Sequence, residues 1–219
     1  MSGTKRIYLV EDHPIFRLGL RELIDEEADL QVCGETDDVG RALAEIGALR
    51  PDVVIVDIGL KGRSGLDLIK EVRDRYGDGV PTLVLSMYDE ALYAERSLHA
   101  GARGYIMKQE AAESIVQALR CVLRGKVYLS ENVVGQLVGK MVGRPQGADQ
   151  SPVERLTDRE LEVFRLIGRG RTTREIAATL HLSTKTIGTY RERIKEKLGL
   201  KNAAELVRHA VHWIESEAS

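Results

Sequence analysis

The sequence predicts an α/β protein in two parts: a five-stranded parallel sheet with helices on both faces, followed by a small domain of four helices. Short apolar runs alternate with longer amphipathic segments up to about residue 124, which is typical of parallel strands joined by helices. Helical patterns without strands fill the chain after residue 157. Between the two parts, "GRPQGADQSP" gathers Gly, Pro, Gln and Asp without apolar periodicity, so we expect a flexible linker there.

Five segments of the first part have the character of strands, because each is a short apolar run bounded by turn-forming or charged residues. They are residues 6–11, 30–35, 52–57, 81–86 and 103–107. Helical segments fill the gaps, near residues 14–26, 38–49, 65–76, 90–100 and 110–124. The first helix begins with Pro14, which suits the first turn, and Ile15, Leu18 and Leu23 recur along it at helical spacing.

The rest of the chain reads as helices with recognisable caps. Residues 125–142 predict a loop and one helix with Ser130 as its N-cap. The tail helices are expected near residues 157–168, 172–180, 183–198 and 202–214. Thr157 and Glu160 form a capping-box pattern, and Ser183 is the predicted cap of the third tail helix. The predicted domains are residues 1–124 and 152–219, joined by residues 125–151.

Composition limits the classes of protein to consider. With 219 residues, the chain is long enough for two small domains with their own cores. No apolar run reaches the ~20 residues of a membrane-spanning helix, and the N-terminal segment lacks a signal-peptide core, so we expect a cytoplasmic protein without a membrane partner. Cys33 and Cys121 lie far apart in apolar segments, which predicts buried free thiols.

Charge is distributed unevenly along the chain. Residues 1–143 hold 18 Lys or Arg against 23 Asp or Glu, whereas residues 152–219 hold 13 against 10. The first part is therefore acidic and the second basic. A basic domain favours nucleic acid as a partner, although an excess this small also fits an ordinary solvated surface.

Polar residues stand where the predicted strands end. Glu11 and Asp12 follow the first strand, Asp57 the third, Ser86 the fourth and Lys108 the fifth. A single acidic residue in such a place usually forms a turn or caps a helix. In an open parallel sheet, however, the carboxyl ends of the strands share the edge where ligands bind, so we expect these side chains to converge.

Such a group of side chains suits magnesium and phosphate chemistry. Mg²⁺ takes a few carboxylates and keeps several waters, and an ammonium and a hydroxyl can bind phosphoryl oxygens. Asp57 ends an otherwise apolar strand and is the candidate nucleophile, because a carboxylate can accept a phosphoryl group as an acyl phosphate. Asp52 begins the same strand and is expected at the opposite edge of the sheet.

Four segments have the order and spacing of the receiver domain of two-component response regulators, which residues 5–124 resemble: "YLVEDHPIFRLGL", "PDVVIVDIGLKGRSGLDLI", "LVLSMYD" and "AGARGYIMK". The resemblance implies a flavodoxin-like (CheY-like) sheet and phosphorylation of the nucleophile by a histidine kinase. The residues it assigns are Asp57 as phosphoacceptor, Glu11, Asp12, Asp57 and the Gly59 carbonyl for Mg²⁺, Ser86 and Lys108 for the phosphoryl group, and Tyr105 as the aromatic switch. The switch residue is expected to turn inward as the serine moves.

The segment after the phosphoacceptor departs from the commoner pattern, since Leu60 and Lys61 stand where such receivers often carry Met-Pro. An aspartate nucleophile also occurs in haloacid-dehalogenase-type phosphatases. Those enzymes need a second acid two residues later, and here that place is Gly59. We therefore expect a switch and not a metabolic enzyme.

The tail contains two short helical patterns joined by a tight turn at "LHLS". Their apolar stripes can pack on each other at helix-turn-helix spacing, and consist of Ile176, Ala177 and Leu180 on the first and Ile187, Ile194 and Leu198 on the second. The opposite face of the second carries Lys185, Arg191 and Lys195, which can meet the phosphates of duplex DNA. A solvated helix in a small bundle has a similar pattern.

The longer tail segment resembles a LuxR-type DNA-binding domain, so nearly the whole chain resembles a response regulator of the NarL/FixJ class. The matching residues are mostly core and cap positions: Leu156, Thr157, Arg159, Glu160, Glu162, Val163, Glu175, Ile176, Ala177, Leu182, Ser183, Thr186, Ile187, Ile194, Lys197 and Leu198. The resemblance implies binding to double-stranded promoter DNA as a homodimer. The last helix, "NAAELVRHAVHWI", carries an apolar stripe that commonly serves dimerisation, with packing inside one domain as the alternative.

Three positions of the expected recognition helix differ from the family's commoner residues. Gly188 replaces a lysine, Tyr190 a histidine and Glu192 a basic residue. Glycine costs the helix about 1 kcal/mol relative to alanine, and a glutamate either accepts from cytosine or repels phosphate. Base reading is left to Thr184, Thr189 or their neighbours. The alternative to a promoter-binding regulator is one that acts through protein contacts, with weak or no specific DNA binding.

Overall fold

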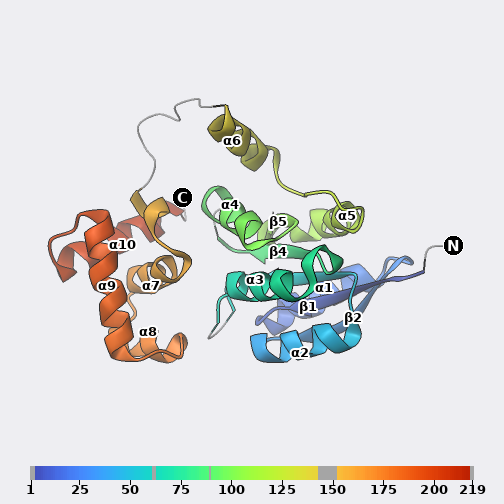
Figure 1. Ribbon diagram of the computed structural model, residues 1–219, viewed down its shortest axis with the longest axis horizontal. Coiled ribbons are helices and arrows are strands. Elements are labelled where there is room, and N and C mark those ends of the chain that lie inside the picture. Colours follow the sequence, from blue (N-terminus) through green and yellow to red (C-terminus); the bar gives the residue numbers. More distant parts are fainter. Residues whose placement is uncertain (1–2, 61–62, 89, 143–151, 218–219) are drawn as a thin grey trace. The chain divides into compact units, whose positions relative to one another are not determined.

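The computed structural model describes residues 3–60, 63–88, 90–142 and 152–217 of the chain. Contacts divide the chain into two compact units, Met1–Gly143 and Arg144–Ser219, and each is described by itself. The first unit is an α/β domain and the second is helical (Figure 1). The core of the predicted linker, residues 143–151, lies outside the described residues, and so does Lys61.

A five-stranded parallel sheet forms the centre of the first unit, in the order β2-β1-β3-β4-β5. Its strands are β1 (Lys5–Val10), β2 (Leu30–Thr36), β3 (Val53–Asp57), β4 (Thr82–Ser86) and β5 (Gly104–Met107). The predicted sheet is confirmed, with strand ends within one residue of those expected. Both faces of the sheet are covered, which is why the central strands β3 and β4 are buried along their whole length.

Helices cover the two faces of the sheet. They are α1 (Pro14–Asp25), α2 (Val39–Leu49), α3 (Gly65–Tyr76), α4 (Glu90–Ala100) and α5 (Ala111–Leu123). Helix α1 packs beside α5, while α2, α3 and α4 are successive neighbours (Figure 1). Pro14 begins α1 as predicted, but Ile15 and Leu18 lie on its exposed side. Leu20 and Ile24 form the buried face instead.

The chain after α5 returns to the free edge of β5 before it forms α6 (Glu131–Met141). The Tyr105 N–H donates to the Tyr128 carbonyl and the Tyr128 N–H to the Arg103 carbonyl, both at 3.0 Å. Ser130 caps α6 as predicted by accepting from the Val133 N–H, and its hydroxyl donates to Glu90 Oε1 of α4 at 2.9 Å. Helix α6 therefore packs on the rest of the first unit through α4.

The second unit contains a short 3₁₀ turn, η3 (Pro152–Arg155), and four helices: α7 (Asp158–Gly168), α8 (Thr173–Thr179), α9 (Thr184–Leu198) and α10 (Ala203–Glu217). The capping box of Thr157 with Glu160 and the Ser183 cap are confirmed. Helix α10 packs on α7, with the Trp213 ring centroid 5.5 Å from that of Phe164. The apolar stripe of α10 thus serves packing within this unit.

The helices of the described ranges were compared with the length and hydropathy of a membrane span. None of them is both long enough and apolar enough to cross a membrane.

The two cysteines, Cys33 and Cys121, are free, but both are partly exposed. The prediction of buried thiols was therefore wrong. Cys33 lies on β2, an edge strand of the sheet, which leaves part of the side chain uncovered.

An ion pair joins α7 to α9 and makes a testable contribution to stability. The Glu160 carboxylate is 3% exposed and accepts from Lys197 Nζ at 2.6 Å and from the Thr157 N–H at 2.8 Å. Burial acts to raise the pKa of Glu160, but these hydrogen bonds outweigh it and hold the pKa below its usual value of 4.5. The carboxylate therefore stabilises the fold above that pH, and the contribution is lost as pH falls through the lowered pKa.

Glu160→Gln is expected to lower the free energy of unfolding by about 1 kcal/mol at pH 7, a modest value because Lys197 is about one-third exposed to water. The difference from wild type should shrink as pH falls below 4.5. Denaturant unfolding of the full chain can be followed by the fluorescence of Trp213, its one tryptophan. Equal stabilities at pH 7 would contradict this reading of the ion pair.

Candidate functional site

Three carboxylates meet at the carboxyl edge of the sheet, where β1 and β3 end side by side. Glu11, Asp12 and Asp57 are 1%, 7% and 3% exposed, so all three predicted acidic residues are buried. Ligand atoms of these residues and of His13 all lie within 4.8 Å of one another. Asp52 lies at the opposite end of β3 as predicted, where it bonds to Lys5 Nζ and the Arg6 N–H.

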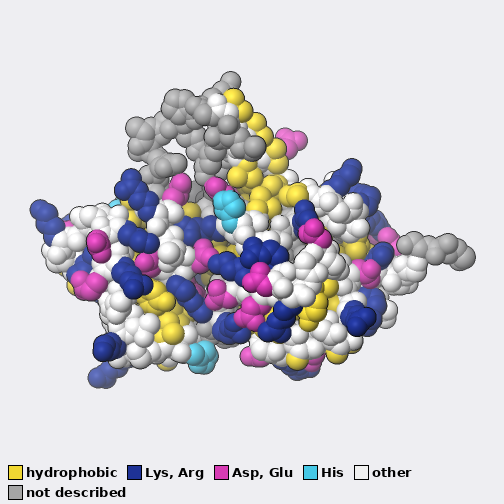
Figure 2. All heavy atoms as spheres, in the orientation of Figure 1, with side chains coloured by type: hydrophobic (Ala, Val, Ile, Leu, Met, Phe, Trp, Pro, Cys, Tyr) yellow, Lys and Arg dark blue, Asp and Glu magenta, His cyan; other side chains and the backbone are white. Residues whose placement is uncertain are grey.

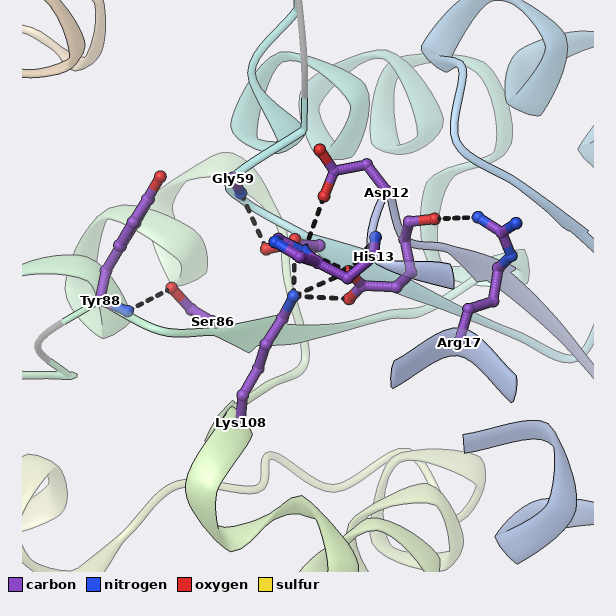
Figure 3. A network of polar contacts seen from close by, with 9 residues as sticks. Asp12, His13, Arg17, Gly59, Ser86, Tyr88 and Lys108 are labelled. Carbon is purple, nitrogen blue, oxygen red and sulfur yellow. Dashed lines mark hydrogen bonds and ion pairs between the residues drawn. The ribbon is translucent and has the colours of Figure 1, made fainter. Parts of the chain in front are cut away.

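The ammonium of Lys108 joins two of these carboxylates (Figure 3). Its Nζ atom lies 2.8 Å from Asp57 Oδ2, 2.8 Å from Glu11 Oε1 and 2.7 Å from Glu11 Oε2. The lysine follows β5, so its long side chain reaches across the edge of the sheet to β3 and β1. The Gly59 N–H donates to Asp57 Oδ1 at 2.8 Å, which places Gly59 beside the nucleophile candidate.

Burial and charge shift the acid-base equilibria of this network. Burial and the nearby Glu11 carboxylate raise the pKa of Asp57 to about 6, although Lys108 and the Gly59 N–H lower it. For Lys108, burial acts to lower the pKa, but Asp57 and Glu11 outweigh it and raise the pKa above 10.5. The lysine is therefore charged at neutral pH, and Asp57 is mainly a carboxylate.

The charges present fit a divalent cation. Among the described residues of the site, one buried ammonium pairs with two of three buried carboxylates. These groups together carry a net negative charge where little water reaches them. Uncompensated buried charge is costly, and clustered carboxylate oxygens are the ligands that Mg²⁺ prefers. The residues present therefore suit the metal that the sequence predicts.

Ser86 and Tyr105 come together through a third residue that sequence reasoning missed. The Ser86 hydroxyl accepts from the Tyr88 N–H at 2.9 Å, and the Tyr105 hydroxyl donates to the Tyr88 carbonyl at 2.7 Å. Both predicted residues are buried, with Tyr105 turned inward. The Tyr88 ring also reaches the acidic site, because a β-carbon on Gly59 would lie only 3.0 Å from its hydroxyl oxygen.

Two further residues of the site were not singled out from the sequence. His13 Nδ1 lies 3.0 Å from Glu11 Oε1 and 2.9 Å from Asp12 Oδ1, so its ring lies over the acidic residues (Figure 3). Arg17 Nη1 donates to the Glu11 carbonyl at 2.6 Å. Both stand within six residues of Glu11, and their position just after two strand-end carboxylates was the available signal.

Close packing also holds the Asp57 backbone in place. Gly65 begins α3, and a β-carbon at this position would lie 2.1 Å from the Asp57 carbonyl oxygen. Only glycine allows the start of α3 to approach the end of β3 this closely. The sequence spacing from Asp57 to Gly65 therefore reflects a backbone contact directly behind the candidate nucleophile.

In the second unit, α9 presents the predicted DNA contacts unequally. Thr184, Lys185 and Thr189 are exposed, whereas Arg191 is partly buried. Lys195 is further removed from solvent, since its side chain is 18% exposed and pairs with Glu192 at 2.8 Å. Arg193 is exposed and was not among the predicted contacts. Figure 2 shows lysine and arginine side chains mixed with acidic ones over the helical unit.

Ser183 caps the start of α9, and the space around Gly188 on this helix is open. Ser183 accepts from the Thr186 N–H at 3.0 Å and so begins the helix. A β-carbon on Gly188 would meet nothing within 4 Å, so no packing requirement excludes a side chain there. Ile187 and Ile194 are fully buried on the opposite side, as the apolar stripe predicts.

Comparison with known families agrees with both units. Residues 7–120 match the response regulator receiver domain, and residues 154–210 match the luxR family of bacterial regulatory proteins. The chain belongs to the two-component response regulators of the NarL/FixJ class, which join a receiver domain to a LuxR-type DNA-binding domain.

Similar proteins span nearly the whole chain. The oxygen regulatory protein NreC of Staphylococcus carnosus is 32% identical over 210 residues, which cover 94% of this chain and 96% of that protein. NreC of Staphylococcus haemolyticus is also 32% identical over 210 residues, which cover 94% of this chain and 96% of that protein. A LuxR-family two-component response regulator from Aurantimonas sp. SI85-9A1 is 31% identical, with a TM-score of 0.59 over 64% of this chain and 99% of that structure. RcsB from Salmonella enterica serovar Typhimurium, bound to a promoter in the presence of the phosphomimetic BeF₃⁻, is 26% identical, with a TM-score of 0.68 over 95% and 98%.

Proposed function

We propose that this response regulator is switched by Mg²⁺-dependent phosphorylation of Asp57 by a histidine kinase, and that it then binds double-stranded promoter DNA as a homodimer. The observation that carries the proposal is the buried network in which Lys108 joins Asp57 and Glu11. The proposed domains are residues 1–124 and 152–219, joined by residues 125–151. The proposed site of action is the cytoplasm.

The proposed chemistry is transfer of a phosphoryl group to a carboxylate. An oxygen of Asp57 attacks the phosphorus of a phosphohistidine, the P–N bond breaks with its electron pair left on nitrogen, and an acyl phosphate forms. Lys108 already contacts Asp57 Oδ2 at 2.8 Å and can bond an oxygen of the incoming group. Ser86 lies on the neighbouring strand, one residue beyond Leu85, which pairs with Asp57.

The metal site would be formed by the residues that follow β1, by the last residue of β3 and by the loop after it. Glu11, Asp12, Asp57 and the Gly59 carbonyl would hold Mg²⁺, in line with the three buried carboxylates, of which Lys108 pairs with two. When bound, Mg²⁺ neutralises the repulsion between a carboxylate and an incoming phosphoryl group. Lys108 would keep its own contact to the Glu11 carboxylate and so hold the other oxygen of that carboxylate in place.

The proposed switch runs through Tyr88. A Ser86 hydroxyl that turns toward a phosphoryl oxygen gives up the hydrogen bond it accepts from the Tyr88 N–H. The Tyr105 hydroxyl donates to the Tyr88 carbonyl. A movement of Tyr88 would therefore also move the Tyr105 side chain of β5. Helix α4 begins two residues beyond Tyr88, and it is the helix on which α6 packs.

DNA binding is proposed for the exposed side of α9. Thr184, Lys185 and Thr189 lie there, with Arg191 and Lys195 on its flank as phosphate contacts. Solved RcsB structures that are 27% identical include two RcsB dimers bound to two parallel DNAs, which supports a dimer on DNA for this chain. Base contacts through Thr184 and Thr189 follow from their exposure near the N-terminus of α9.

A second candidate function is regulation through protein contacts with weak or no specific DNA binding. The Glu192 to Lys195 ion pair and the lack of a side chain at Gly188 favour it, because both reduce the positive surface of α9. Binding to genomic DNA fragments at increasing salt separates the two candidates. A domain that contacts phosphates must lose affinity as salt rises, and absence of such binding would favour protein contacts.

The phosphorylation proposal is tested with Mg²⁺ and acetyl phosphate as a small phosphodonor. The wild-type chain is expected to gain one acid-labile phosphate, measured as an increase in intact mass, and Asp57→Asn is expected to gain none. Asp52→Asn is the matched control at the other end of β3 and should be labelled like wild type. The proposal fails if wild type gains no phosphate, or if the phosphate survives Asp57→Asn.

A further inference from the structure

Phe16 lies in the first turn of α1, beneath the ammonium of the phosphoacceptor site. Lys108 Nζ lies over its ring, 4.8 Å from the ring centroid. The ring is partly buried and packs against the apolar core formed with α1 and α5. It is thus held in place by the fold, and it contacts the lysine from a helix that contributes no carboxylate to the site.

The same ammonium makes three contacts to carboxylate oxygens. They are Glu11 Oε1, Glu11 Oε2 and Asp57 Oδ2, at 2.7 to 2.8 Å. The Lys108 side chain is 5% exposed, so almost no water reaches it. A cation over an aromatic face is attracted by the ring's negative face, and the attraction is stronger where the cation is desolvated.

The aromatic ring offers what a further carboxylate cannot. When Asp57 takes up a phosphoryl group, Lys108 has to redirect a hydrogen bond from Asp57 Oδ2 to a phosphoryl oxygen. A further carboxylate would compete for that hydrogen bond. A ring attracts the ammonium without accepting a strong hydrogen bond, and it has the same charge before and after the transfer.

We propose that Phe16 is a positioning residue that holds the Lys108 ammonium by its ring face, so that the ammonium is ready for the incoming phosphoryl group. The inference rests on the proposed phosphorylation of Asp57 and adds a residue to that site. Phe16 does not touch the reacting atoms in this arrangement. It acts through Lys108.

Fluorinated phenylalanines at position 16 test the ring face with almost no change of shape. Added fluorines withdraw the negative charge of the ring step by step. With acetyl phosphate at saturation and constant Mg²⁺, the rate of phosphorylation should fall in the order of zero, one, two and three fluorines. The trifluoro ring is expected to be about tenfold slower than phenylalanine, while the Mg²⁺ concentration for half-maximal rate stays the same. Phe16→Leu should be phosphorylated about as slowly as the trifluoro chain, and Phe16→Tyr, which keeps the aromatic ring, should be phosphorylated at about the wild-type rate.

Leu23→Ala is the matched control, because Leu23 is also a partly buried residue packed against the same core and has no contact with the ammonium among the interactions described. It should lower stability while leaving the saturated rate near wild type. A flat series of rates across the fluorinated rings on a chain that is phosphorylated overturns this inference alone. A wild-type chain that gains no phosphate overturns the inference together with the proposed function.

Discussion

Lys108→Met is expected to lower the free energy of unfolding of the first unit by about 3 kcal/mol at neutral pH without metal, and to make that stability strongly dependent on Mg²⁺. The wild-type ammonium offsets the charges of Asp57 and Glu11 at 2.7 to 2.8 Å. Removal of one partner of a buried ion pair leaves an uncompensated charge, which typically costs about 3 to 5 kcal/mol. We expect the low end, because Asp57 can take up a proton.

The direction of the Mg²⁺ effect follows from the same charges. Burial and Glu11 raise the pKa of Asp57, and Lys108 is the main group that lowers it. Without Lys108, the described residues of the site include three carboxylates and no buried ammonium, so a divalent cation should stabilise the variant more than wild type. Any ligand that binds only the folded state raises its stability in this way.

Denaturant unfolding followed by circular dichroism, with and without Mg²⁺, measures both effects. Lys5→Met is the matched control, since Lys5 pairs with Asp52 at 2.9 Å with both side chains about one-third exposed or more. Lys5→Met should lower the free energy of unfolding by at most about 1 kcal/mol, and this decrease should be independent of Mg²⁺. An Mg²⁺ effect of the same size in Lys108→Met and wild type would refute the proposed cation site.

Glu192→Lys is the second large effect we expect, a rise of about tenfold in affinity for duplex DNA of random sequence at low salt. Glu192 is 73% exposed and pairs with Lys195 at 2.8 Å. The substitution removes a negative charge from α9, adds a positive one and frees Lys195. Each additional phosphate contact steepens the fall of log affinity with log salt by about 0.9, so the slope should steepen by one to two units.

Fluorescence anisotropy with a labelled duplex at several salt concentrations measures affinity and slope together. Glu196→Lys makes the same change of charge one turn further along α9, and its gain should be smaller because recognition helices contact DNA through their N-terminal residues. Equal gains in the two variants would mean that net charge alone matters. No gain in either would favour the regulator that acts through protein contacts.

Local patterns predicted the elements and their caps well. Apolar runs located all five strands to within one residue, and Ser130, Thr157 and Ser183 cap the helices for which they were predicted. Such features depend on residues a few positions apart, which a sequence displays directly. The exposed positions of Ile15 and Leu18 were beyond this reasoning, because they obey helical spacing on a side of α1 that no neighbour covers in the described structure.

The candidate site was predictable in its members more than in its contacts. Parallel strands bring their carboxyl ends to one edge, so the positions of Glu11, Asp57 and Lys108 at strand ends were enough to group them. The ring of Phe16 beneath the lysine and the two bonds to Tyr88 depend on side-chain directions. Likewise, Lys195 reads as a free cation in the sequence, whereas the fold places it against Glu192.

Periodicity and spacing along the chain were sufficient to predict the two-unit architecture and the group of residues at the strand ends, and the motifs at these positions resemble those of the family. In a parallel sheet the carboxyl ends of neighbouring strands lie side by side. The grouping of the strand-end residues can therefore be predicted without knowledge of side-chain packing. The hydrogen-bond partners, in contrast, became known only from the folded chain: Lys108 with both Asp57 and Glu11, and Ser86 with Tyr105 through Tyr88. Such contacts require distances near 2.8 Å between residues up to 97 positions apart, and only the packing of helices against the sheet sets distances of that kind.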